Sequence, residues 1–232
     1  MVGDNSNLDG WQSAPMWSEW LRLTRLQWSG KIAFHTEASR WESAHIANPE
    51  DVDVNFSESG GSYRTSLANH IATVSDPSLF CELILHKSWA LLESHSKLVQ
   101  YICDEKRWSE MDNLTADQLA EIDDTKLSGG IEAWSQKLMN CTGQKWEQVF
   151  GGREGLIEIS IVRNALAHGY NTASKALLDA AETRGVAVPY ASGDDLKVSF
   201  ELLHTYRGRI RSFCRIVGDG AFHLGRGTHR IR

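Results

Sequence analysis

The longest run of helical periodicity in the sequence covers residues 78–107. Two histidines, His86 and His95, lie on it nine residues apart and therefore on nearly one face. No third ligand is evident, so the pattern favours surface or core histidines over a metal site. We expect this segment to form the central helix of a bundle. Its apolar residues recur at helical spacing and are Leu79, Leu83, Ile84, Leu91, Leu98 and Ile102.

Shorter helices are expected on both sides of this segment. Residues 50–62 are acidic and rich in glycine and serine, which indicates a loop, and Gly151-Gly152 indicates a turn. Weak alternation over residues 185–190 and 196–199 predicts a small hairpin around Ser192-Gly193-Asp194. Helical spacing predicts helices at about residues 16–26, 31–47, 64–74, 130–140, 144–150, 158–168, 172–184 and 200–217, with another helix start near residue 115.

These elements predict an all-α fold, a helical bundle with peripheral helices and room for one small β-hairpin. Nothing repeats at a fixed period, and no Ser/Pro linker separates domains. Residues 1–14 are polar and rich in glycine, asparagine and serine, so we expect a disordered start. We expect one helical domain over residues 15–218 and a basic tail over residues 219–232.

The charge of the chain is distributed unevenly. Residues 207–232 hold seven arginines and one acid, a net charge of +6, and because the whole chain carries −6, residues 1–206 carry −12. The basic end could follow the phosphates of RNA, or it could be a solvated tail that pairs with the acidic body. The candidate RNA-binding residues are Arg207, Arg209, Arg211, Arg215, Arg226 and Arg230.

The cysteines and the hydropathy indicate a cytoplasmic protein. No stretch approaches the ~20 apolar residues of a membrane span, and the N-terminus lacks the order of a signal peptide. The four cysteines are widely spaced and form no Cys-x-x-Cys pair, so a zinc site is not expected and reduced thiols are the simplest interpretation. We expect no metal and no cofactor. The cysteines are Cys81, Cys103, Cys141 and Cys214.

The most informative motif lies in residues 158–170. Its apolar residues recur at three- and four-residue spacing, which predicts a buried helix, and Gly169 is a natural helix stop. Asn164 and His168 are four apart and share a face, whereas Arg163 and His168 are five apart, roughly 140° around the axis. These groups can line two walls of a groove, where a guanidinium binds phosphate and an imidazole moves a proton.

The six residues from Arg163 to His168 resemble the Arg-polar-x-x-x-His signature of the HEPN superfamily, whose small α-helical members include many metal-independent ribonucleases. With Tyr170 the motif is similar to that of the toxin in HEPN/MNT toxin–antitoxin pairs. The resemblance covers about residues 153–172, with a looser likeness to about residue 218 and no match for residues 1–75. It implies a HEPN-like bundle, a homodimer whose motif helices meet, and an RNA substrate.

The resemblance implies an endoribonuclease that acts as a toxin or an antiviral-defence effector. Arg163 would neutralise charge on the scissile phosphate, His168 would act as general base or acid on the ribose 2′-hydroxyl, and Asn164 would orient His168 or hold the phosphate. Two alternatives remain open: a non-catalytic HEPN module that binds a nucleotide or a partner protein, and a structural network that caps the helix.

Tyr170 is a candidate modification site. In HEPN/MNT pairs the corresponding tyrosine receives AMP from the partner nucleotidyltransferase, so the resemblance implies an antitoxin of that kind as a partner. The alternative is that Tyr170 packs its ring on a neighbouring helix.

Overall fold

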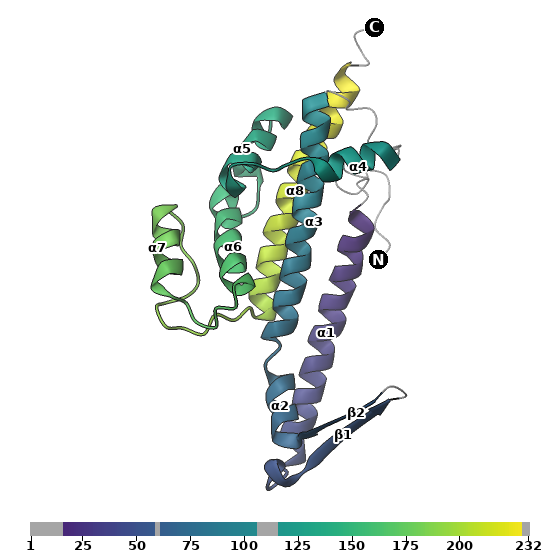
Figure 1. The fold of residues 1–232 in the computed structure, drawn as a ribbon, viewed down its shortest axis with the longest axis vertical. Helices are drawn as coiled ribbons and strands as arrows, with labels where there is room; N and C mark the ends of the chain where they lie inside the picture. Colours follow the sequence, from purple (N-terminus) through teal and green to yellow (C-terminus); the bar gives the residue numbers. More distant parts are fainter. Residues whose placement is uncertain (1–15, 59–60, 106–115, 229–232) are drawn as a thin grey trace.

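The computed structural model describes residues 16–58, 61–105 and 116–228, and it is mostly helical (Figure 1). Three long helices run side by side: α1 (Trp17–Ala44), α3 (Ser78–Glu105) and α8 (Phe200–Thr228). The apolar core lies between them and includes the fully buried rings of Tyr206 and Phe213. The prediction of an all-α bundle with one small hairpin is confirmed, and residues 78–105 form its central helix as expected.

Helices α5, α6 and α7 cover one side of the long ones. Helix α6, which carries the motif, lies between α7 and α8 in Figure 1 and contacts both of them. The apolar residues of α6 pack in the core against the neighbouring helices, so the motif lies on a well-packed part of the fold. The bounds of the shorter helices are α2 (Leu67–Ser75), α4 (Ala116–Asp124), α5 (Gly130–Thr142), the 3-10 turn Trp146–Gln148, α6 (Gly152–Ala167) and α7 (Lys175–Thr183).

The two helices predicted at residues 16–26 and 31–47 are one continuous helix, α1. Gly30 lies inside it, between the two predicted segments. A Cβ atom at Gly30 would lie 2.3 Å from Cζ of Phe80 on α3. The glycine therefore permits close approach of α1 and α3 and does not end the helix.

The small hairpin lies at a different place from the predicted one. Strands β1 (Asp53–Glu58) and β2 (Gly61–Ser66) pair antiparallel after a 3-10 turn at Pro49–Asp51, in the segment expected to be a loop. Val54 lies opposite Thr65 in the register, and such β-branched residues favour strands despite the acidic composition.

The predicted hairpin at residues 185–199 is wrong. This segment has no paired strands and holds one isolated bridge, between Thr172 and Asp195. The Ala191 backbone N–H donates to the Asp194 carboxylate (2.7 Å), and Tyr190 Oη donates to the Lys197 carbonyl (2.8 Å). These local bonds form a compact loop in place of a ladder.

The last helix is longer than predicted. It was expected to end near residue 217 with a basic tail after it, but α8 continues to Thr228. Gly220 lies inside the helix, and a Cβ there would lie 2.7 Å from Cβ of Thr142 on α5. This glycine also permits the close approach of two helices.

The predicted disordered start at residues 1–14 lies outside the described residues.

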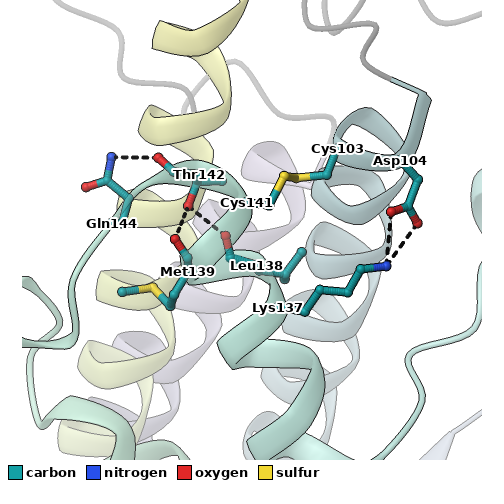
Figure 2. The surroundings of a disulfide bond; sticks show 8 residues. All are labelled: Cys103, Asp104, Lys137, Leu138, Met139, Cys141, Thr142 and Gln144. Carbon is teal, nitrogen blue, oxygen red and sulfur yellow. Dashed lines mark hydrogen bonds and ion pairs between the residues drawn. A yellow bond between two sulfur atoms is a disulfide. The ribbon is translucent and has the colours of Figure 1, made fainter.

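The expectation of four reduced cysteines is wrong. Cys103, near the end of α3, and Cys141, near the end of α5, form a disulfide (Figure 2). The Lys137–Asp104 ion pair (3.0 Å) joins the same two helix ends. Cys81 and Cys214 are buried thiols. None of the helices described is both long and apolar enough to cross a membrane.

Candidate functional site

Helix α6 presents a short polar strip on an otherwise buried helix. Its apolar side is buried, including Ile159, Val162 and Leu166, as the spacing predicted. The helix ends at Ala167, and Gly169 follows with the positive φ of 74° expected of a helix stop. The strip consists of Arg163, Asn164 and His168, which are partly or fully exposed.

Arg163 and Asn164 interact directly. Arg163 Nη1 donates a hydrogen bond to Asn164 Oδ1 (3.0 Å). The Nε of Arg163 is buried and has no hydrogen-bond partner among the described residues. The amide therefore holds one branch of the guanidinium, while other N–H donors remain available to a ligand.

Arg163 and Asn164 line an open groove of about 770 Å³ between α3, α6 and the loop that leads into α5. Two nearly buried indoles, Trp89 and Trp134, contribute to its wall. Lys97 and Lys126 add positive charge. Acidic groups line it as well, so the groove is not a purely basic channel; they are Glu93, Asp123 and Asp124.

His168 is not among the residues that line this groove. It caps the C-terminus of α6, where its backbone N–H bonds to the Asn164 carbonyl (3.1 Å), and its side chain is exposed. Within the described part of the chain, no hydrogen bond joins its imidazole to Arg163 or Asn164. The structural network expected under the capping alternative is therefore limited to the Arg163–Asn164 bond.

Tyr170 lies beside His168, with 6.3 Å between the ring centroids. Its side chain is 51 % exposed. The ring is therefore accessible at the end of α6 and does not belong to the core.

His86 on α3 is a residue that the sequence did not assign to the site. It is half-buried, and burial together with the nearby charge of Arg163 lowers its pKa below the ordinary value. The imidazole is therefore mostly neutral at neutral pH. The only sequence signal for His86 was its helical spacing from three other residues on the outward face of α3. They are Leu79, Leu83 and Glu93.

The candidate RNA-binding arginines do not form one surface. Arg207 is buried, and Arg209 pairs with Glu158 on α6 (2.5 Å). Arg211 lies over the ring of Trp17 (5.4 Å), and Arg215 is exposed. Two of the six arginines are thus used inside the fold. The side chain of Arg226 and all of Arg230 lie outside what the structure describes.

A search of the described residues finds no group of three or more histidine, cysteine, aspartate or glutamate side chains arranged to hold a metal ion. Comparison of the chain with protein-family models, with characterised proteins and with solved structures found no match. The resemblance to the HEPN superfamily therefore remains an expectation from the sequence motif.

Proposed function

We propose that this protein is an endoribonuclease that cleaves RNA without a metal ion. The observation that supports this most is the strip on α6, where an arginine, an amide and a histidine are accessible at the end of a buried helix. A rigid helix can hold catalytic groups in place. A HEPN-like toxin or antiviral-defence effector is the setting that the motif suggests.

In the proposed reaction the ribose 2′-hydroxyl attacks the adjacent phosphorus. His168 accepts the hydroxyl proton, the bond from phosphorus to the 5′-oxygen breaks, and the leaving oxygen takes a proton from solvent water. Arg163 stabilises the negative charge that develops on the phosphate oxygens. The products are a 2′,3′-cyclic phosphate and a 5′-hydroxyl, so DNA would not be a substrate.

The proposed active unit is a homodimer. In one protomer Arg163 lines the groove while His168 lies outside it. A second copy is therefore needed to bring an arginine and a histidine of the motif to the same phosphate. Leu79 and Leu83 are 67 % and 62 % exposed on the face of α3 that carries His86. Exposed leucines on this helix face offer an apolar surface for such a partner.

One observation favours a second candidate, a non-catalytic HEPN module that binds a nucleotide. The groove combines the donors of Arg163 with the indoles of Trp89 and Trp134, and His168 is not part of it. A groove of this kind could hold a nucleotide without cleaving it.

Incubation of purified protein with single-stranded RNA and excess EDTA separates the two candidates. The nuclease proposal predicts cleavage by the wild type, and loss of cleavage in Arg163→Ala and His168→Ala with unchanged far-UV circular dichroism. Two exposed residues provide matched controls: Arg153→Ala on the same helix and His35→Ala on α1 should cleave normally. Full activity in His168→Ala would exclude this site, whereas binding without cleavage would favour the module.

A further inference from the structure

A buried positive charge lies between α1 and α8. The side chain of Arg207 is only 4 % exposed. Its guanidinium donates to Gln27 Oε1 (2.7 Å), Thr24 Oγ1 (2.9 Å) and the Trp20 carbonyl (3.3 Å), and it lies 4.5 Å from the centre of the Trp20 ring. All of these partners are neutral. Within the described residues no carboxylate pairs with Arg207.

The hydrogen bonds of Arg207 are incomplete as well. A guanidinium has five N–H donors, and three of them are used by the bonds to α1. The Nε is buried without a partner. A buried cation without a counterion, and with a buried donor left without an acceptor, is costly. Burial lowers the pKa of Arg207 to about 10 for the same reason.

This guanidinium lines a cavity of about 100 Å³ that opens to the surface. Arg211 and His204 line it from α8, and Trp28, which is 49 % exposed, lines it from α1. No aspartate or glutamate lines the cavity. One water molecule occupies about 30 Å³ in the liquid. The cavity therefore has room for a few atoms of that size, which suits one tetrahedral oxyanion.

We infer that this cavity binds a phosphate-class oxyanion, with Arg207 at its base and Arg211 and His204 at its mouth. The anion would supply the missing counterion and acceptors, and arginine forks match phosphate oxygens well. The phosphate could be free, or it could belong to a nucleotide whose base stacks on the exposed Trp28. None of the lining residues lies on α6, so the inference does not depend on the proposed ribonuclease activity.

Isothermal titration with sodium phosphate, at constant ionic strength, tests this inference. We expect one site per chain with a dissociation constant below about 1 mM, and binding at least about tenfold weaker in Arg211→Gln because one charge-assisted contact is lost. Arg215→Gln is the matched control, since Arg215 is an exposed arginine on the same helix outside the cavity, and it should bind like the wild type.

Further arms identify the source of the phosphate. If AMP binds more tightly than phosphate and adenosine does not bind, the ligand is a nucleotide. If AMP and phosphate bind with equal affinity, the ligand is free phosphate. Both results support the site. Arg207→Met should abolish binding, and if it does not fold, Arg211→Gln decides. No binding of phosphate or AMP, or equal phosphate binding by the wild type and Arg211→Gln, would overturn the inference.

Discussion

The guanidinium of Arg163 and the imidazole of His86 are electrostatically coupled across the contact between α6 and α3. Burial and the charge of Arg163 both lower the pKa of His86. The coupling places a neutral imidazole beside the arginine that we propose as the phosphate-binding group. His86 is therefore a second base candidate at this site, from a helix outside the motif.

Replacement of Arg163 by glutamine should raise the pKa of His86. Loss of the positive charge removes one of the two causes that disfavour the imidazolium, while burial remains. NMR titration of the histidine ring protons measures this directly. An unchanged pKa of His86 in this variant would contradict the coupling.

His95 should make the fold less stable as the pH falls. It is fully buried, its Nε2 bonds to the Cys214 carbonyl (2.9 Å), and burial lowers its pKa from 6.5 to about 4. Because the folded-state pKa is depressed, the unfolded chain binds the proton first, and stability is lost as pH falls from about 6.5 towards 4. Between pH 7.5 and 5.5 this amounts to about 1 kcal/mol.

Urea unfolding at the two pH values tests the effect. His95→Gln removes the titrating group, so its free energy of unfolding should fall by about 1 kcal/mol less than that of the wild type over this interval. Equal losses in the two proteins would show that His95 does not titrate as a buried neutral group.

The pairing of Gly30 with Phe80 explains one difference between sequence and structure. Helical spacing alone located most helices, because it depends on local apolar patterns such as that of Ile159, Val162 and Leu166. It could not distinguish a glycine that ends a helix from one that admits a ring from a distant helix. That distinction depends on the tertiary contact.

The candidate site shows the same division between local patterns, which the sequence reveals, and tertiary contacts, which it does not. The order Arg163, Asn164 and His168 on one helix with a glycine stop follows from local sequence. The coupling to His86, the burial of Arg207 and the Cys103–Cys141 disulfide each join residues far apart in the chain. One sequence contains no local signal for such pairs.

Gly30→Ala should destabilise the protein. The added Cβ would overlap the Phe80 ring, and overpacking of this kind costs about 1–3 kcal/mol, which exceeds or offsets the ~1 kcal/mol gain in helix propensity. In a Phe80→Leu background the same substitution should be neutral or stabilising. Chemical denaturation of the four proteins measures the coupling, and additive effects would contradict the close contact.

Tyr170→Phe tests the toxin interpretation. The half-exposed hydroxyl at the end of α6 is accessible to a modifying enzyme, and an added AMP would place a phosphate beside the proposed site. We expect the variant to keep its nuclease activity but to escape neutralisation by a co-expressed nucleotidyltransferase. If intact-mass spectra of the co-expressed wild type show no AMP adduct, Tyr170 is not the modified residue.

The ends of the cleaved RNA test the proposed chemistry most directly. Mass spectrometry of the products formed in EDTA should show a 2′,3′-cyclic phosphate and a 5′-hydroxyl, because the 2′-hydroxyl is the nucleophile. A substrate with a single 2′-deoxy nucleotide at the cleaved position should resist cleavage there, and His168→Ala should form neither product. Cleavage of the 2′-deoxy position, or 5′-phosphate ends, would contradict the assignment of this site to metal-independent RNA cleavage.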